Sequence, residues 1–167
     1  ETETYLNSGG TRQPGFELYF SDWLIRQRST SFIRGMQFNE SVTFDKFTFN
    51  GNNDGKQLTG VPWQVFVSSL QLKFPERIYL YLEHNYTARI PLTDANTVFA
   101  DHYNLVQAKA GWQFVANRKS KFEIYAGVGN LLNEKYSLGN DLNAVGNRYY
   151  NPAPLRNYYI GFNAGFK

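Results

Sequence analysis

The last ten residues of this chain, 158–167, alternate large apolar side chains with small or polar ones up to the final position. Successive side chains of a β-strand point to opposite faces, so this segment has one apolar and one polar face. The apolar face carries Tyr158, Ile160, Phe162, Ala164 and Phe166. Chain ends usually fray unless they are held, and an aromatic two-faced final strand is typical of a membrane barrel that must close its wall. The closing strand of a soluble β-sandwich is the alternative for this segment alone.

The composition agrees with a protein made of strands. Phe, Tyr and Trp together make up 17% of the 167 residues, which suits strands and the aromatic girdles of membrane interfaces. No apolar run is long enough for a transmembrane helix. The mean hydropathy of -0.49 does not identify a soluble protein, because a polar lumen face and polar loops lower this value in barrels.

Several classes of function find no support in the sequence. The chain has no cysteine, and its two histidines, His84 and His102, are separated by a loop, so we expect no disulfide framework and no metal site. No carboxylates are paired at a spacing suited to acid-base catalysis, and we expect neither an enzyme nor a cofactor. The net charge of +3 comes without a basic stripe, which argues against nucleic-acid binding. The opening residues 1–4 lack signal-peptide features, so we expect either a removed signal or an excised piece.

Period-two patterns recur along the chain, and no helical repeat is sustained. They predict seven strands, at 14–25, 31–44, 61–72, 77–88, 103–114, 121–129 and 156–166. The connections alternate between short ones, at 26–30, 73–76 and 115–120, and long ones, at 45–60, 89–102 and 130–155. Outer-membrane barrels have short periplasmic turns and longer extracellular loops, so the alternation favours that architecture.

Charged residues indicate which face of each strand meets lipid. Placing Lys109 at the hydrocarbon midplane would cost about 2–4 kcal/mol, so its face is expected to line the lumen. Glu123 on the next strand falls on the same inner face, which predicts a lumen pair with Lys109. His84 falls on the outward face, toward the outer interface. Arg34 and Glu40 share the apolar face of 31–44, and without a bulge both are expected near the interfaces, where the penalty is about 0–1 kcal/mol.

The strand predicted at 61–72 has apolar side chains on both faces, which predicts a β-bulge or partial burial. Seven strands also raise the question of closure. An open sheet in lipid would expose two edges of unpaired backbone groups, each costing several kcal/mol. The segment is therefore expected to be part of a wider wall.

Four motifs resemble the C-terminal region of TonB-dependent outer-membrane receptors. Residues 127–136, GVGNLLNEKY, look like the late strand that runs into an Asn-Leu-Phe-Asp/Asn-x-x-Tyr motif, with Leu132 in place of the usual Phe. Residues 148–159, RYYNPAPLRNYY, are similar to the Pro-x-x-Arg-x-Tyr that precedes the final strand. Residues 60–62 resemble the family's Gly-Val-Pro, and residues 15–17 its Gly-Phe-Glu. The four motifs span most of the chain in the family's order.

The resemblance implies an all-β fold, an antiparallel transmembrane β-barrel segment of about seven strands from a 22-stranded barrel. Residues 1–13 would end an extracellular loop or a preceding strand, and residues 14–167 would form the C-terminal barrel portion, without the plug domain. The implied function is TonB-energised uptake of a scarce ligand, a ferric siderophore, across the outer membrane of a Gram-negative bacterium. The implied partners are outer-membrane lipid, the rest of the barrel and the plug, TonB through the missing N-terminal part, and the barrel-assembly machinery.

Ligand contacts are expected from loop residues at the barrel mouth, because arginine pairs with anionic groups and tyrosine stacks on aromatic ones. The candidates are Arg89, His102, Arg148, Tyr149 and Tyr150. In the final strand, the resemblance implies a role in barrel assembly for Tyr158, Ile160, Phe162 and Phe166. Arg156 is expected to anchor the residues that lead into this strand.

Two other functions remain open from the sequence. The chain length suits a complete small outer-membrane barrel with a structural or adhesive role, although the inner faces hold few side chains large enough to fill such a barrel. A soluble all-β binding module would instead gather the apolar faces in a core. Within the receptor hypothesis, cobalamin, an oligosaccharide or a peptide are alternative ligands.

Overall fold

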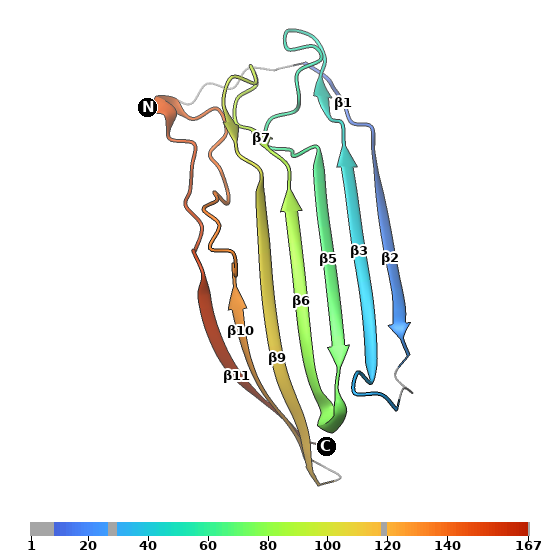
Figure 1. Ribbon diagram of the computed structural model, residues 1–167. Coiled ribbons are helices and arrows are strands. Elements are labelled where there is room, and N and C mark those ends of the chain that lie inside the picture. Colours follow the sequence, from blue (N-terminus) through green and yellow to red (C-terminus); the bar gives the residue numbers. More distant parts are fainter. Residues whose placement is uncertain (1–8, 27–29, 118–119, 167) are drawn as a thin grey trace.

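The computed structural model describes residues 9–26, 30–117 and 120–166, and its main body is one antiparallel sheet of seven strands (Figure 1). The strands follow one another in sequence order across the sheet. They are β2 (Gly15–Ile25), β3 (Gly35–Asp45), β5 (Gln64–Lys73), β6 (Ile78–Thr87), β9 (Tyr103–Asn117), β10 (Ser120–Gly129) and β11 (Asn157–Phe166). All seven predicted strands are therefore confirmed.

Shorter elements lie in the connections. β1 (Thr11–Arg12) pairs with β4 (Thr48–Phe49), and β7 (Ile90–Pro91) pairs with β8 (Phe99–Ala100). Two 3-10 segments, η1 (Pro75–Arg77) and η2 (Val145–Asn147), complete the assigned elements. Among the described residues no helix is long and apolar enough to cross a membrane.

The connections differ at the two ends of the sheet. Residues 46–63, 88–102 and 130–156 join strands at one end, which we call the loop end, whereas 74–77 join β5 to β6 at the other, the turn end (Figure 1). The alternation of long and short connections agrees with the sequence. Most of the first predicted turn, 26–30, lies outside the described residues.

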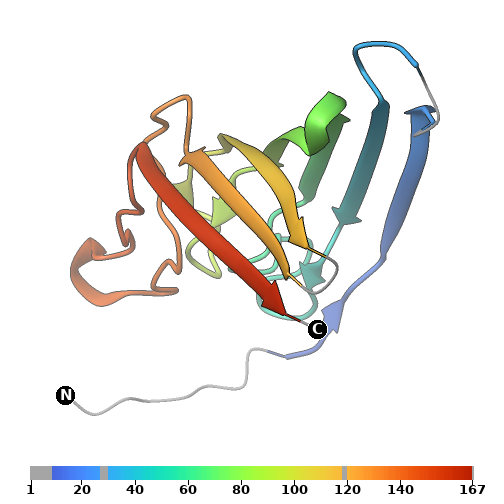
Figure 2. The same cartoon turned by 90° about the horizontal axis from the view of Figure 1, so that it is seen from below.

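The sheet is open and curved. Seen from below, its strands lie along an arc (Figure 2). β2 and β11 form the two edges, and neither pairs with the other. The described sheet is therefore a section of wall rather than a closed barrel.

The start of β3 differs from the sequence prediction, and of the two alternatives predicted for β5 the structure shows the second, partial burial. β3 begins at Gly35 rather than at residue 31, and Phe32 instead packs on Phe74 of the next turn, with ring centroids 5.4 Å apart. β5 pairs with both neighbours without a register shift, so the expected bulge is absent there. Trp63 precedes β5, whereas Val65 and Val67 stay on the face opposite Phe66, and the β5 side chains are mostly half-buried, which is the partial burial that the sequence predicted.

The position predicted for Glu40 is wrong. Arg34 directly precedes β3 and thus lies at its end, but Glu40 is the central residue of the eleven in β3. β3 keeps an unbroken register with β5, where Glu40 lies opposite Ser68. Glu40 therefore places a charged side chain in the middle of an apolar face, away from both ends of β3.

The buried core of the described residues lies in the loops rather than under the sheet. Leu92, Ala100 and Tyr149 form a buried cluster, with Ile90, Val98 and Ala144 packed against it. Large apolar side chains of the sheet stay exposed, among them Ile160 at 80% and Phe16 at 58%. Such a patch marks a surface that another apolar phase or protein covers.

The turn between β5 and β6 holds two residues in the left-handed region. Glu76 has φ of 55° and Arg77 has φ of 60°, and the amide of Ile78 donates to the carbonyl of Pro75. Two-residue hairpin turns of this kind strongly prefer Asn-Gly, because both central residues need positive φ. The turn thus carries steric strain of about 1–2 kcal/mol per residue, somewhat offset by the stiffness of non-glycine residues in the unfolded chain.

Replacing this pair by Asn-Gly, in the double variant E76N/R77G, is expected to raise the free energy of unfolding by about 1 kcal/mol. Denaturant titration of the full-length protein measures the change. The variant Arg77→Ala serves as control, because it removes the guanidinium but leaves a Cβ at positive φ. An equal gain in the control would show that the side chain, rather than the backbone, is unfavourable.

Candidate functional site

The inner, concave face of the sheet is polar. The side chains of Asn39, Ser69, Glu83, Gln107 and Glu123 lie on it, joined by cross-strand hydrogen bonds. Asn39 donates to the Ser69 hydroxyl at 3.1 Å, and Gln107 donates to the Glu83 carboxylate at 2.5 Å. Polar side chains paired along a strand face in this way are suited to contact with water or a polar partner.

Lys109 of β9 and Glu123 of β10 form an ion pair on this face. Lys109 Nζ lies 3.6 Å from Glu123 Oε1, which confirms the predicted pair. The two residues are not direct cross-strand neighbours, because Lys109 lies opposite Gly127 and Glu123 opposite Gln113. The lysine stem spans this offset, and its ammonium group lies 3.9 Å from the centroid of the Tyr125 ring.

The Glu123 carboxylate is satisfied from several strands. The Tyr79 hydroxyl of β6 donates to Oε1, and Asn163 of β11 donates to Oε2 at 3.1 Å. With Lys109 of β9 the cluster joins four successive strands. A carboxylate held by one cation and two hydrogen-bond donors is stabilised in its charged form.

Tyrosines on the polar face cover glycines of the neighbouring strand. The rings of Tyr79 and Tyr125 lie over Gly111 and Gly161, where an added Cβ would come within 2.5 and 2.2 Å of ring atoms. Tyr159 covers Gly127 in the same way, at 2.3 Å. The missing side chains therefore allow the rings to lie flat along the wall, an arrangement known as aromatic rescue of glycine.

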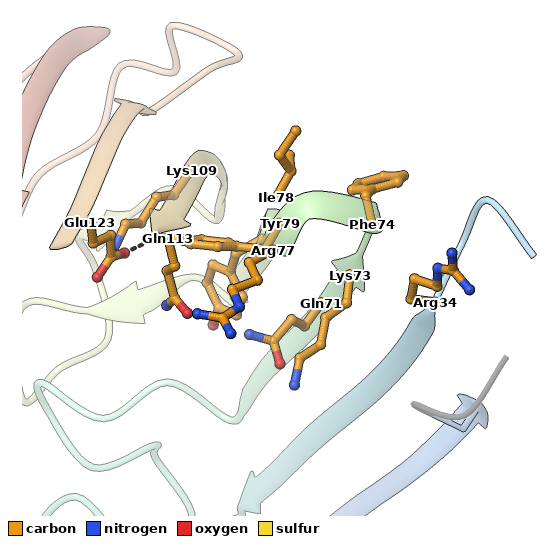
Figure 3. Close-up of a pocket in the computed structure, with 11 residues that line it drawn as sticks. Arg34, Gln71, Lys73, Phe74, Arg77, Ile78, Tyr79, Lys109, Gln113 and Glu123 are labelled. Carbon is orange, nitrogen blue, oxygen red and sulfur yellow. Dashed lines mark hydrogen bonds and ion pairs between the residues drawn. The ribbon is translucent and has the colours of Figure 1, made fainter. Parts of the chain in front are cut away.

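A pocket of about 660 Å³ opens on the polar face toward the turn end (Figure 3). Its volume lies in the range of ligand sites. Four cationic side chains and one carboxylate line it, so the lining is net positive. They are Arg34, Lys73, Arg77, Lys109 and Glu123.

Aromatic and neutral groups complete the pocket: Tyr79, Tyr81, Gln71, Gln113, Phe74 and Ile78. Arg77 reaches it from the strained turn, and Lys73 Nζ lies 4.8 Å from the Trp23 ring centroid. The arrangement favours anionic and aromatic groups. The sequence did not identify this site, because its cations come from three separate segments and no run of basic residues marks them.

The outer face is apolar and carries aromatic residues at both ends of the strands. At the loop end the rings of β2, β3, β5 and β6 and of His102, just before β9, lie 5.0–6.2 Å apart, in the order Phe16, Phe44, Phe66, Tyr86 and His102. At the turn end a second group spans β9 to β11 with spacings of 4.9–6.0 Å: Trp112, Phe114, Phe122, Phe162 and Phe166. Two aromatic girdles around an apolar band are typical of membrane barrels.

Asp94 and Asn96 connect the long loops at the loop end. Asp94 accepts a hydrogen bond from Thr59 at 2.6 Å and another from Asn143 at 3.1 Å. Asn96 exchanges two bonds with the backbone of Gln57, at 2.7 and 2.9 Å. The loops are thus held against one another by side-chain bonds that no local sequence signal indicates.

Three of the predicted ligand residues meet around Phe99 and Ala100. The Arg89 guanidinium lies 4.5 Å from the Phe99 ring centroid, and the Tyr150 hydroxyl donates to the Phe99 carbonyl at 3.0 Å. Tyr149 is buried in the loop cluster with Ala100, and its ring centroid is 6.3 Å from that of Tyr150.

The other two predicted ligand residues lie apart. Arg148 is exposed, whereas His102 joins the loop-end aromatic row beside Tyr86 on the outer face. Binding of a ligand by any of the five stays a prediction. Within the described part of the chain no group of three or more His, Asp or Glu side chains could hold a metal ion.

The residues predicted for barrel assembly lie on the outer face of edge strand β11. Tyr158, Ile160, Phe162 and Phe166 are between 58% and 80% exposed. Their assembly role stays a prediction. The amide of Arg156, just before β11, donates to Asn133 Oδ1 at 3.1 Å, which ties the start of the strand to the preceding loop.

Comparison with known proteins places this sheet among solved receptor structures. No protein-family model matches the chain. The ferric-catecholate import receptor Fiu of Escherichia coli K12 superposes with a TM-score of 0.67 at 20% identity, covering 93% of this chain and 21% of the receptor. The ferric yersiniabactin uptake receptor FyuA of Yersinia pestis superposes with a TM-score of 0.70 at 19% identity, covering 96% of this chain and 24% of the receptor.

This chain thus spans less than a quarter of the length of either receptor. The likeness extends over nearly all of the chain, and it confirms the architecture predicted from the sequence. The chain therefore has the fold of a β-barrel segment of the kind found in TonB-dependent receptors.

Proposed function

We propose that this chain is the C-terminal wall of an outer-membrane receptor that takes up a ferric siderophore with energy delivered through TonB. The observation that carries the proposal is the open sheet with one polar, concave face and one apolar face, which carries an aromatic row at the loop end of β2 to β6 and another at the turn end of β9 to β11. A soluble module would bury these apolar side chains, and a complete small barrel would pair β2 with β11.

In this proposal the polar face lines the barrel interior of a Gram-negative outer-membrane protein. The rest of the barrel pairs with β2 and β11, the plug domain occupies the interior, and outer-membrane lipid covers the apolar face. TonB acts through the part of the protein outside this chain. The assembly machinery would use the exposed aromatic side chains of β11, Tyr158, Phe162 and Phe166 among them.

The ligand class follows from two observations. The two similar receptors are described as importing a ferric catecholate and taking up ferric yersiniabactin. The net positive lining of the pocket and the cationic loop residues Arg89 and Arg148 suit a ligand that carries acidic groups around iron. A cobalamin, oligosaccharide or peptide ligand would explain the positive charge of the pocket and of these loop residues less well.

Uptake of radioactive iron by bacteria that express the full-length protein tests the proposal. Uptake from a ferric catecholate or from ferric yersiniabactin is expected to require both the protein and TonB. The variant Arg148→Gln is expected to lower uptake at limiting ligand about tenfold, because a charge-assisted contact is lost.

Arg148 is the informative loop residue because its side chain is exposed, whereas replacing Tyr149 would open the loop cluster. Lys135→Gln, a change of another cation in the same loop, is the matched control and should keep full uptake. Uptake that persists without TonB, or without the gene, would refute the assignment. Equal losses in both variants would remove Arg148 from the ligand site.

A further inference from the structure

The pocket of about 660 Å³, which we call the turn-end pocket, lies on the polar face of the wall (Figure 3). Within it Lys73 of β5 lies opposite Tyr79 of β6, and Gln71 lies opposite Tyr81. Lys109 of β9 lies opposite Tyr81 on the other side. Directly paired residues of neighbouring strands point the same way, so all of these side chains face the space that the proposed function assigns to the barrel interior.

The turn-end pocket is distant from the loop residues that are predicted to bind the ligand at the barrel mouth. Tyr81, the pocket residue nearest the loop end on β6, lies six residues before Thr87, where that strand ends, and Arg89 lies beyond Thr87. At about 3.3 Å per residue the separation along the strand is at least roughly 20 Å. Short turns of outer-membrane barrels face the periplasm, so the pocket lies where an imported ligand would leave the barrel.

The cations of the pocket lack matching carboxylates. Glu123, the one carboxylate of the lining, already receives the Lys109 ammonium group and the Tyr79 hydroxyl. Within the described part of the chain, neither Lys73 nor Arg77 has a carboxylate partner. A wall that gathers charges of one sign focuses their field on the space in front of it and raises the local concentration of the opposite sign. The pocket therefore favours an anionic occupant.

The other groups of the pocket suit a ligand that carries both acidic oxygens and aromatic rings. The Arg77 guanidinium can bind two oxygens of one acidic group through parallel hydrogen bonds. In Figure 3 the amide side chains of Gln71 and Gln113 extend to the same side of the wall as Arg77. The hydroxyls of Tyr79 and Tyr81 donate to carboxylates of the wall, and their rings line the pocket, where aromatic groups of a ligand can stack on them.

We propose that the turn-end pocket is a transit site, which binds the acidic iron complex after it has left the mouth and before it enters the periplasm. The inference rests on the proposed function and adds a second ligand site to it. A site on a transport path must bind strongly enough for the ligand to enter and weakly enough for it to leave. Arg77 is exposed and Lys73 is half-buried, and exposed charges bind weakly in water, so the pocket is suited to brief occupancy.

The uptake rate at saturating ligand tests the transit site in bacteria that express the full-length protein. The labelled probe is the ferric catecholate or ferric yersiniabactin, whichever the parent protein takes up. Arg77→Gln is expected to lower the saturating rate about five- to tenfold, whereas binding of the probe to cells that lack TonB should stay within about twofold of the parent. Arg148→Gln, at the mouth, should instead weaken this surface binding. A saturating rate equal to that of the parent in Arg77→Gln overturns the transit site.

Two further variants separate the charge of the pocket from other effects of substitution. Arg77→Lys keeps a cation in the same turn and is expected to retain at least roughly half of the saturating rate. Arg26→Gln removes an exposed cation at the same end of the sheet that does not line the pocket, and it should leave the rate unchanged. Equal losses in Arg77→Lys and Arg77→Gln, or a loss in Arg26→Gln as large as that in Arg77→Gln, would overturn the role of the pocket charge.

Permeability of the resting protein distinguishes the ligand from the plug domain as the occupant of the pocket. If an acidic segment of the plug filled the pocket, Arg77→Gln would loosen the plug, and cells would admit a large antibiotic in the absence of the iron complex. A slower saturating rate without such a leak is the expected result. A leak that accompanies the slower rate would assign the pocket to the plug and overturn the transit site.

The same measurements separate failure of this inference from failure of the proposed function. A parent protein that takes up neither probe through TonB would refute the proposed function, and the transit site with it. Parent uptake that Arg77→Gln leaves unchanged would refute the transit site alone. Loss of surface binding in Arg77→Gln would show that the pocket and the mouth act as one site, which also overturns the inference and leaves the proposed function in place.

Discussion

Replacing Ala108 with arginine is expected to lower the free energy of unfolding of the full-length barrel in lipid by about 2–4 kcal/mol. Ala108 lies on the apolar face of β9, opposite Leu82 on one side and Val128 on the other. Both aromatic rows are several residues away, so the guanidinium would enter the apolar band near its middle. Urea titration of the protein in lipid vesicles measures the change.

The neighbouring residue provides the control. Gln107 points to the polar face and donates to the Glu83 carboxylate, and Gln107→Arg would convert that bond into an ion pair. Its stability is expected to stay within about 0.5 kcal/mol of the parent protein. The free energies of unfolding of these two adjacent variants would then differ by the whole cost of placing a charge in hydrocarbon. Similar effects at both positions would mean that water reaches both faces, and the membrane assignment would be wrong.

The seven long strands could be predicted because apolar and polar side chains alternate along each of them, as expected for a wall with one apolar and one polar face. Lys109 and Glu123 identified the inner face by the cost of charge in hydrocarbon, and the structure pairs them. The two-residue strands of the loops left no such signal. The short connection between β5 and β6 was predicted at 73–76, but the left-handed backbone of Glu76 and Arg77 was not, because this turn lacks the glycine that such a turn prefers.

The parts that escaped prediction depend on register and on contacts distant in sequence. Glu40 was expected near a strand end because its cost was known, but its position depends on where β3 begins. The basic pocket gathers Arg34, Lys73 and Lys109 from segments that are distant in sequence. Tyr149 reads as a ligand residue in sequence, whereas the folded loops bury it with Leu92.

The contact of tyrosine with glycine across strands was also invisible in the sequence, and it leads to the second large effect. Gly161→Ala is expected to lower the free energy of unfolding by about 1–3 kcal/mol, the usual cost of overpacking. The new Cβ would lie 2.2 Å from Cζ of Tyr125, so the ring must leave the wall. The same movement would take the ring away from the Lys109 ammonium, 3.9 Å from its centroid.

Gly165→Ala is the matched control in the same strand and on the same face. Its nearest neighbour to an added Cβ is a backbone oxygen 4.0 Å away, so nothing has to move. Alanine there is expected to stabilise the strand by about 0.5–1 kcal/mol, because glycine loses more conformational entropy on folding. Opposite signs at the two glycines would separate crowding from strand propensity, and denaturant titration of both variants gives the comparison.

Removing the ring tests the cause directly. In a Tyr125→Ala background the space above Gly161 is empty, and Gly161→Ala should then lose its penalty and act as Gly165→Ala does. The coupling energy of this double-mutant cycle is expected to be about 1–3 kcal/mol, in the range seen for residues in contact. A penalty that persists without the ring would show that Gly161 is required by the backbone. In that case Tyr125 covers the glycine without depending on it, and the wall is held by its strand pairing rather than by these rings.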